Sequence, residues 1–223
     1  MKDKLVQAVS EEIGISLEAH QADRAVSYLS AVSEANKHLN LTAARGEEDL
    51  LYKHFLDSLY LLKFYDLGKS ESGKNEIKML DLGTGAGFPG VPLKIRLEAM
   101  ELHLLDSARR KINFLKYTLQ SLKISGVRYL NGRAEDFSEQ QKYRGQYPYI
   151  CSRAVGKLPE LLRLGMPFLK KEGLYFIYKG PQGGQELEEG KDLVDCWGAM
   201  VKGEHSYTLP GGETRKIYIL QKS

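Results

Sequence analysis

A glycine-rich segment, Asp81–Gly90, restricts the fold of this chain more than any other feature. Its sequence, DLGTGAGFPG, follows the apolar residues KML and leads into the helical stretch VPLKIRL. A strand that ends in Gly83, Gly85 and Gly87 before a helix makes a sharp turn, and its backbone lets a ligand approach closely. The segment therefore predicts a nucleotide-like ligand beside the first strand of an α/β sheet.

Short apolar runs alternate with helical stretches from Lys78 onward. Continuous apolar strands separated by helices are typical of a parallel sheet with helices on both faces. The final segments EHSYTL and RKIYILQ differ, because the turn Pro210–Gly212 leaves no room for a crossover helix between them. Such a short connection predicts an antiparallel hairpin. The expected fold class is α/β, with a Rossmann-like sheet whose last strand is antiparallel.

The first 65 residues are expected to form a separate helical region. Apolar residues recur there at helical spacing, as in Val26, Leu29 and Val32, and no strand pattern is convincing. Residues 66–77 are polar, contain Gly and Ser and lack periodicity, which indicates a connector. We therefore predict an N-terminal helical region at 1–65, a connector at 66–77 and a ligand-binding domain at 78–223.

Composition and charge exclude several classes of protein. No apolar stretch approaches the length that crosses a bilayer, so we expect no membrane association and a cytoplasmic location. Cys151 and Cys196 lie far apart, and neither belongs to a CxxC pair, so we expect reduced thiols and no metal site. The formal charge of +3 permits an RNA partner without requiring one.

Two aspartates and one proline bear on the identity of the ligand. The span Gly85–Gly90 also fits the GxGxxG pattern of NAD-binding proteins. Asp81 would meet the positively charged amino-acid end of S-adenosylmethionine but would repel a pyrophosphate. Pro89 removes one N–H donor that a phosphate would use at a helix N-terminus. These two residues favour S-adenosylmethionine, whereas Asp106, roughly 20 residues after the glycines, is expected to bind the ribose of either cofactor.

Polar residues also follow the later strands. The cluster Gly132–Asp136 comes after the third strand, and ligands of open α/β sheets bind beyond the carboxyl ends of the strands. We expect this cluster to approach the adenine. Arg153 and Lys179 follow the next two strands and should point into the same crevice, with a solvated strand end as the alternative for each.

His54, Asp57 and Ser58 share one face of an expected helix, at spacings i, i+3 and i+4. A Ser-His-Asp hydrolase needs its serine on a strained turn beside an oxyanion hole, and a regular amphipathic helix has neither. We therefore interpret these residues as packing the helical region against the sheet or lining an RNA entrance, with packing favoured.

Together these motifs resemble the glucose-inhibited division protein B family, bacterial methyltransferases that act on guanine N7 of small-subunit ribosomal RNA. The resemblance covers most of the chain. The extension Phe88-Pro89-Gly90 and the helix Lys53–Ser58 are more specific than the glycines alone. The other matching segments are Asn40–Ala43, Asp81–Gly90, Leu105–Ser107, Arg110–Lys111 with Phe114–Leu115, Arg133–Glu135, Ser152–Ala154, Lys179–Gly180 and Pro210–Arg215.

The resemblance implies a seven-stranded class I methyltransferase sheet, S-adenosylmethionine as cofactor and 16S ribosomal RNA, naked or in an assembling particle, as substrate. Guanine N7 has an exposed lone pair and no proton, so in-line transfer needs positioning and no general base, and we expect no catalytic dyad. We also expect a monomer. The expected cofactor residues are Asp81, Gly83, Gly85, Gly87, Phe88, Asp106, Ala134, Glu135 and Arg153. The expected RNA-binding residues, for which a solvated surface is the alternative, are Arg109, Arg110, Lys111 and Lys179.

Two other functions stay open on the sequence alone. A methyltransferase of a small molecule predicts a deep apolar pocket closed by a lid near residues 28–52. An NAD-dependent oxidoreductase predicts binding of NAD and a proton donor close to it.

Overall fold

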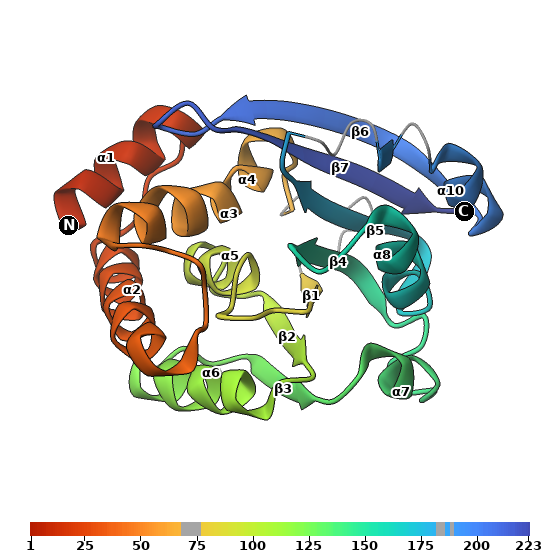
Figure 1. Cartoon of the computed structure of the whole chain (residues 1–223), viewed down its shortest axis with the longest axis horizontal. Coiled ribbons are helices and arrows are strands. Elements are labelled where there is room, and N and C mark those ends of the chain that lie inside the picture. The colour runs from red at the N-terminus through yellow and green to blue at the C-terminus, as the bar shows by residue number, and fades with distance from the viewer. Residues whose placement is uncertain (68–76, 182–185, 188–189) are drawn as a thin grey trace.

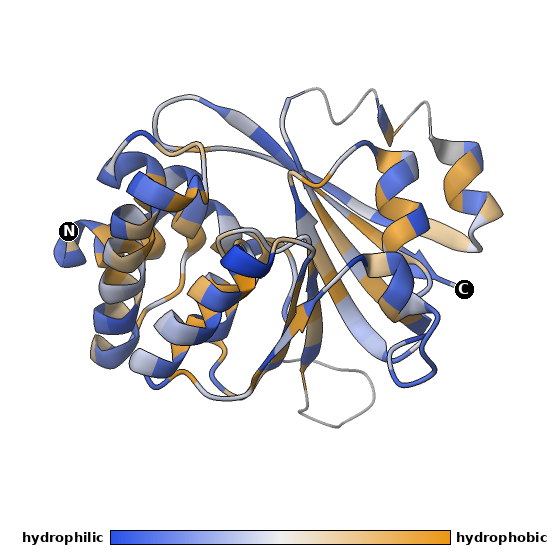
Figure 2. Cartoon of the chain, turned by 60° about the horizontal axis from the view of Figure 1, so that its bottom comes forward, coloured by the Kyte–Doolittle hydropathy of each residue, from blue (hydrophilic) through white to orange (hydrophobic). Residues whose placement is uncertain are grey.

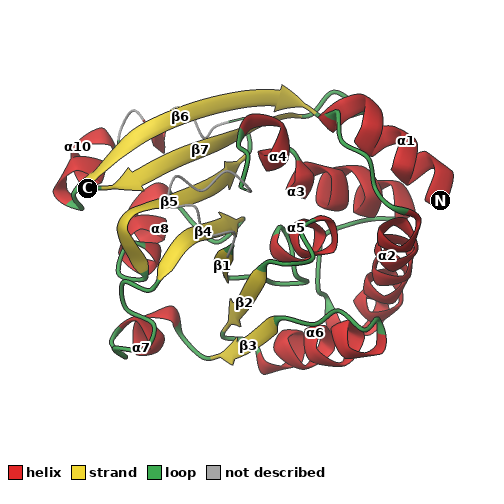
Figure 3. Cartoon of the chain, turned by 180° about the vertical axis from the view of Figure 1, so that it is seen from behind, coloured by secondary structure: helices red, strands yellow, loops and turns green. Residues whose placement is uncertain are grey.

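The structure, a computed structural model, describes residues 1–67, 77–181, 186–187 and 190–223. Its centre is a seven-stranded sheet in the order β3-β2-β1-β4-β5-β7-β6. Helices cover both faces of this sheet (Figures 1 and 3). The predicted α/β class is confirmed. The strands are β1 (Lys78–Leu82), β2 (Glu101–Asp106), β3 (Val127–Asn131), β4 (Tyr147–Arg153), β5 (Leu169–Lys179), β6 (Ala199–Thr208) and β7 (Thr214–Lys222).

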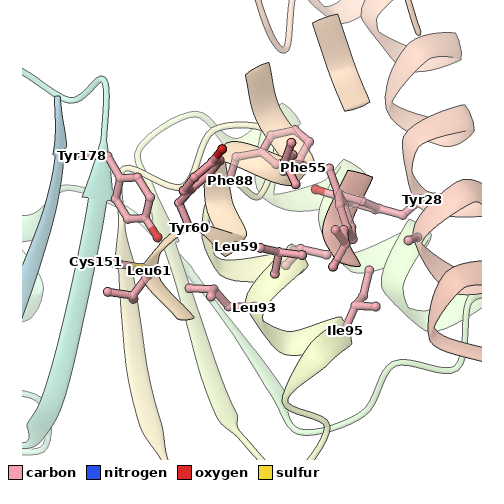
Figure 4. Packing of buried hydrophobic residues seen from close by; sticks show 14 of the residues in the cluster. Tyr28, Phe55, Leu59, Tyr60, Leu61, Phe88, Leu93, Ile95, Cys151 and Tyr178 are labelled. Carbon is pink, nitrogen blue, oxygen red and sulfur yellow. The ribbon is translucent and has the colours of Figure 1, made fainter. Parts of the chain in front are cut away.

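Helices alone precede β1 in the described part of the chain, as predicted. They are α1 (Lys2–Ile13), α2 (Ala19–Leu39), the π-helix η1 (Asp49–Leu56), α3 (Asp57–Leu59) and α4 (Leu61–Phe64). Their apolar side chains share one buried cluster with β1, β4 and β5, so they pack directly on the sheet. Figure 4 shows Leu59 of α3 beside Leu93 of α5 (Gly90–Arg96). The expected connector includes residues 68–76, which lie outside the described residues, so the division into domains stays a prediction.

Side chains of the central strands alternate between two hydrophobic clusters. Cys151 and Phe176 face the N-terminal helices, α5 and α6 (Arg109–Ser121), whereas Ile150 and Tyr175 face α8 (Leu158–Gly165). Two further helices are α7 (Ala134–Ser138), which contacts α8, and α10 (Lys191–Cys196), which contacts β6. Burial on both faces explains why the central strands contain apolar runs, visible as orange segments of the central arrows in Figure 2.

The carboxyl ends of the parallel strands meet along one edge of the sheet. Strands β1 to β5 pair in parallel, while β7 pairs antiparallel with both β5 and β6. The predicted C-terminal hairpin is thereby confirmed. Because β7 lies between β5 and β6, its first residues lie where β5 ends, with Lys216 opposite Lys179.

The segment around His54 differs from the regular α-helix that was expected. In η1 the N–H of Asp57 donates to the carbonyl of Tyr52, five residues earlier, and to that of His54. A regular α-helix would pair the Asp57 N–H with the carbonyl of Lys53, four residues earlier. In the π-helix the Lys53 carbonyl accepts instead from Arg153 Nη1, at 2.9 Å. The helix around His54 is therefore shaped to bind the end of β4.

None of the helices in the described part of the chain has the length and apolarity to cross a bilayer.

Candidate functional site

The carboxylate of Asp81 organises the glycine-rich loop from inside. Its Oδ2 accepts hydrogen bonds from Thr84 Oγ1 at 2.6 Å and from the N–H of Gly90 at 3.0 Å, and the side chain is fully buried. Burial raises its pKa to about 6, against the opposing effect of the hydrogen bonds from Thr84 and Gly90. The carboxylate thus occupies the N-terminus of α5, where the loop turns into the helix.

Two glycines of the loop combine a positive φ with no room for a side chain. Gly83 has φ +67°, and a Cβ there would lie 2.6 Å from Val155 Cγ2. Gly87 has φ +92°, and a Cβ would lie 2.7 Å from Val91 Cγ2 and 2.8 Å from Leu115 Cδ2. Glycine at these positions therefore lets the loop pass close to the segment after β4 and to helix α6.

A cavity of about 380 Å³, the smaller cavity, lies at the carboxyl ends of β1, β2 and β3. On its wall, Asp106 Oδ2 accepts from the N–H of Gly85 at 2.9 Å and Oδ1 from the N–H of Ala108 at 2.8 Å. Each carboxylate oxygen keeps a further lone pair, so Asp106 can still accept hydrogen bonds from ligand hydroxyls. The lining residues are Leu82, Gly83, Leu105, Asp106, Ser107, Lys111, Gly132, Arg133, Ala134, Glu135, Ala154, Val155, Glu160 and Leu164.

A second cavity of about 650 Å³, the larger cavity, adjoins the first at Ala154, which lines both. It lies between η1, the ends of β4 and β5 and the start of β7. Its ionisable lining is predominantly basic. The lining residues are Ala43, Ala44, Arg45, Asp49, Lys53, His54, Asp57, Arg153, Ala154, Gly156, Leu161, Tyr178, Lys179, Gly180, Glu213 and Arg215.

Arg153, the last residue of β4, joins the larger cavity to the glycine-rich loop. Its Nη1 donates to Asp57 Oδ2 at 2.8 Å and its Nη2 to His54 Nδ1 at 2.6 Å. The guanidinium carbon lies 5.3 Å from the ring centroid of Phe88 in the loop, within the range of a cation–π contact. A side chain with this many contacts has a fixed orientation.

His54 is neutral in this arrangement. Guanidinium groups only donate, so Nδ1 is the acceptor and Nε2 carries the proton that it donates to Thr42 Oγ1, at 2.7 Å. Burial and the neighbouring Arg153 lower the pKa of His54 to about 3. Ser58 is fully buried, and its Oγ donates to the backbone carbonyl of His54 at 2.5 Å. A Ser-His-Asp triad is excluded because the Ser58 hydroxyl does not reach the imidazole.

Asp57 links the helices to the C-terminal hairpin. Its Oδ1 accepts from Tyr207 Oη of β6 at 2.7 Å, while Oδ2 binds Arg153. The hydroxyl of Tyr178, in β5, donates to the carbonyl of Ser58 at 2.8 Å. Sequence reasoning did not find Tyr207 or Val155 as neighbours of the site, since nothing in their local sequence marks them. Thr42 was named only within the matching segment Asn40–Ala43, without a role.

The expected site residues fall into three groups. Gly83, Asp106, Ala134, Glu135 and Lys111 line the smaller cavity. Arg153 and Lys179 line the larger cavity, where Lys179 Nζ pairs with Glu186 at 2.7 Å and donates to the carbonyl of Gly156 at 2.6 Å. Six of the expected residues line neither cavity. They are Asp81, Gly85, Gly87 and Phe88, which belong to the glycine-rich loop but do not line either cavity, and the exposed Arg109 and Arg110.

Solved structures share the fold at low sequence identity. A protein named TrmN, from Thermus thermophilus, superposes with a TM-score of 0.56 at 15% identity over 84% of this chain and 53% of that chain. A SAM-dependent methyltransferase from Aquifex aeolicus gives a TM-score of 0.52 at 18% identity over 73% of this chain and 89% of that chain. These similarities concern the fold alone.

Sequence relatives match over nearly the whole chain. A protein of Alkaliphilus oremlandii named ribosomal RNA small subunit methyltransferase G is 39% identical over 223 residues, 100% of this chain and 90% of that protein. A protein of the same name from Streptococcus pyogenes is 38% identical over 213 residues, 95% of this chain and 87% of that protein. The profile of the GidB family, described as rRNA small subunit methyltransferase G, matches residues 21–210. The chain belongs to the GidB family.

Proposed function

We propose that this chain transfers a methyl group from S-adenosylmethionine to N7 of a guanine in 16S, small-subunit, ribosomal RNA. The observation that carries the proposal is the pair of cavities that adjoin at Ala154, beyond the carboxyl ends of the strands. Two ligands held in these cavities would meet at their junction, which is the arrangement that direct in-line transfer needs. The names of the relatives, ribosomal RNA small subunit methyltransferase G, support the substrate class.

The smaller cavity fits the cofactor in the chemistry of its donors and acceptors. Asp106 would accept hydrogen bonds from the ribose hydroxyls, and Ala134 and Glu135 would border the adenine. Gly83 gives the ligand access to the backbone at the end of β1. When bound, S-adenosylmethionine supplies a methyl group made electrophilic by its sulfonium. Asp81, Gly85, Gly87 and Phe88 would act on the cofactor by shaping the loop.

The larger cavity fits an anionic substrate. Arg45, Lys53, Arg153, Lys179 and Arg215 line it, against the acidic Asp49, Asp57 and Glu213. Phosphates of RNA are attracted by such an excess of cations. The neutral His54 and the fixed Arg153 would orient the base, whose N7 attacks without prior loss of a proton.

The position of Asp81 argues against an NAD-dependent oxidoreductase. A pyrophosphate would use the N–H groups at the start of the helix after the glycine loop. In this protein the Gly90 N–H already donates to the Asp81 carboxylate, whose charge would repel a phosphate there. Methylation of a small molecule stays the second candidate, and the basic lining of the larger cavity favours RNA over it.

Calorimetry with two cofactors tests which cofactor the protein binds. We expect S-adenosylmethionine to bind and NAD to give no heat. Binding of NAD without any response to S-adenosylmethionine would overturn the proposed chemistry.

Mapping of N7-methylguanosine in small-subunit RNA tests the substrate. RNA from cells with the gene should carry one such modification that RNA from cells without the gene lacks, and adding back the purified protein with S-adenosylmethionine should restore it. Equal maps from the two strains would contradict the RNA substrate. Restoration on naked RNA or only on assembling particles would identify the substrate form. We expect a cytoplasmic monomer.

A further inference from the structure

The positive charge of this protein is concentrated in one segment, Ser107–Ala134. This segment holds seven Lys and Arg residues and no Asp or Glu, whereas the rest of the chain holds 25 basic and 29 acidic residues. Without this segment the chain would carry a net negative charge. The modest total of +3 therefore hides a strongly basic region.

The basic segment forms one edge of the molecule. It comprises α6 and the edge strand β3, which lie side by side in Figures 1 and 3. Within the described residues, ion pairs involve only two of its seven cations, Lys111 with Asp106 at 4.0 Å and Arg128 with Glu101 at 3.5 Å. The remaining five leave their charge available to a ligand. They are Arg109, Arg110, Lys116, Lys123 and Arg133.

The placement of cations at the start of α6 works against helix stability. The first turn contains Arg109, Arg110 and Lys111 and no acidic residue. A helix N-terminus carries partial positive charge, so exposed cations there destabilise it by about 0.3–1 kcal/mol each. A solvated helix face shaped only by stability would have the opposite charges at this end.

Tyr117 adds an aromatic surface to the same helix. Its ring is 70% exposed, the highest value among the large hydrophobic side chains that protrude from the described surface. Lys116 precedes it, and Arg110 lies seven residues earlier, two helical turns away on the same side. An exposed aromatic ring flanked by cations is the combination that binds unpaired bases and their phosphates.

The outer face of α6 begins at the mouth of the smaller cavity and leads away from it. At its start the N–H of Ala108 binds Asp106, and Lys111 lines that cavity. The 13 residues of α6 extend about 20 Å at 1.5 Å per residue, a length that several consecutive phosphates span. RNA bound along α6 would thus end at the mouth of the smaller cavity, which adjoins the larger cavity at Ala154.

We propose that the outer face of α6, with Lys116 and Tyr117, together with Lys123 in the turn just after the helix, is a second RNA-docking surface, which binds nucleotides outside the one that is methylated. Lys116 and Lys123 pair with phosphates, and Tyr117 stacks on an unpaired base. This inference rests on the proposed function. It assigns a binding surface to the part of the RNA that lies outside the two cavities.

Binding of unmodified small-subunit RNA at several KCl concentrations tests the proposal. The variant Lys116→Ala/Lys123→Ala should bind this RNA at least tenfold more weakly, and its log–log salt slope should be shallower by about 1.5, since each phosphate contact contributes about 0.7–0.9. Tyr117→Ala should weaken binding about tenfold without changing the slope, because stacking contributes about 1–3 kcal/mol per base. Tyr117→Phe should retain wild-type binding.

Matched controls separate this surface from general charge effects. Lys170→Ala/Lys171→Ala removes two exposed lysines at the other end of β5 and should leave RNA affinity and slope unchanged. All variants should bind S-adenosylmethionine as wild type does and methylate at the wild-type rate when RNA is saturating, which also shows that they are folded.

Three outcomes would overturn the inference. One is unchanged RNA binding in all α6 variants; another is an equal loss in the Lys170/Lys171 control. The third is a loss of affinity for intact small subunits without a loss of affinity for naked RNA, which would mean that the α6 face binds a ribosomal protein. If the wild-type protein binds the RNA through α6 but methylates nothing, the proposed function fails and the docking surface stands.

Discussion

Arg153 and Asp57 are 96 residues apart in the sequence, and their side chains form an ion pair of 2.8 Å. Their side chains are 14% and 2% exposed, so both charges are largely removed from water. The pair joins the N-terminal helices to the end of β4. Asp57 also binds Tyr207, so one carboxylate connects three parts of the protein that line the larger cavity.

Asp57→Asn should reduce stability strongly. Breaking a buried ion pair by removing one charge leaves the other uncompensated, at a cost of about 3–5 kcal/mol. Tyr207→Phe removes only the second hydrogen bond of the carboxylate and should reduce stability by about 1 kcal/mol. Urea unfolding measures both values. Similar losses in the two variants would mean that the ion pair does not dominate.

His54 should make stability depend on pH below neutrality. Its pKa is about 3 in the fold against 6.5 for an unperturbed histidine, so the unfolded chain binds more protons between these values. Stability is therefore full above pH 6.5 and declines as the pH falls. Between pH 7 and 5 wild type should lose about 2 kcal/mol more than His54→Asn, at about 1.4 kcal/mol per pH unit. Parallel unfolding curves for the two proteins would contradict this ionisation.

Gly83→Ala should impair both folding and cofactor binding. The substitution strains a residue at φ +67° and brings a Cβ to 2.6 Å from Val155 Cγ2, and the two effects together cost about 2–4 kcal/mol. Gly85→Ala is the control, with φ +60° but no atom nearer than 3.9 Å, so it should cost about 1–2 kcal/mol. Thermal unfolding and calorimetry with S-adenosylmethionine measure the difference. Equal effects at both glycines would show that contact with Val155 is unimportant.

Asp106→Ala should weaken binding of S-adenosylmethionine by about 10- to 100-fold, since a hydrogen bond to a charged group contributes about 1.5–3 kcal/mol. Calorimetry gives the affinity, and circular dichroism shows whether the loop survives the loss of the Gly85 and Ala108 hydrogen bonds. A folded variant with wild-type affinity would remove Asp106 from the cofactor site.

Much of the fold could be predicted because its signals are local. The apolar runs mark strands buried on both faces, and the short turn at Pro210–Gly212 permits only a hairpin. Asp106 and Ala134 could be placed at one edge for the same reason, since the carboxyl ends of parallel strands meet there, and both line the smaller cavity.

The network around Arg153 could not be predicted, because it depends on contacts between distant segments. Nothing in the sequence near Tyr207 indicates that its hydroxyl binds Asp57. The π-helix was missed as well, since its stability comes from Arg153, which takes up the Lys53 carbonyl that a regular helix would use. Asp81 was expected to meet the amino-acid end of the cofactor. In the structure its side chain is completely buried and binds Thr84 and Gly90, and this burial follows only from the packing of α5 on the sheet.

The position of β7 between β5 and β6 bears on the order in which the protein can assemble. Strand β6 is synthesised first but has no place in the sheet until β7 arrives and pairs with both neighbours. The same late strand delivers Arg215 to the wall of the larger cavity. A nascent chain that has reached only Thr208 therefore exposes an unpaired edge of β5 and lacks part of that wall, so the larger cavity is among the last features to be completed.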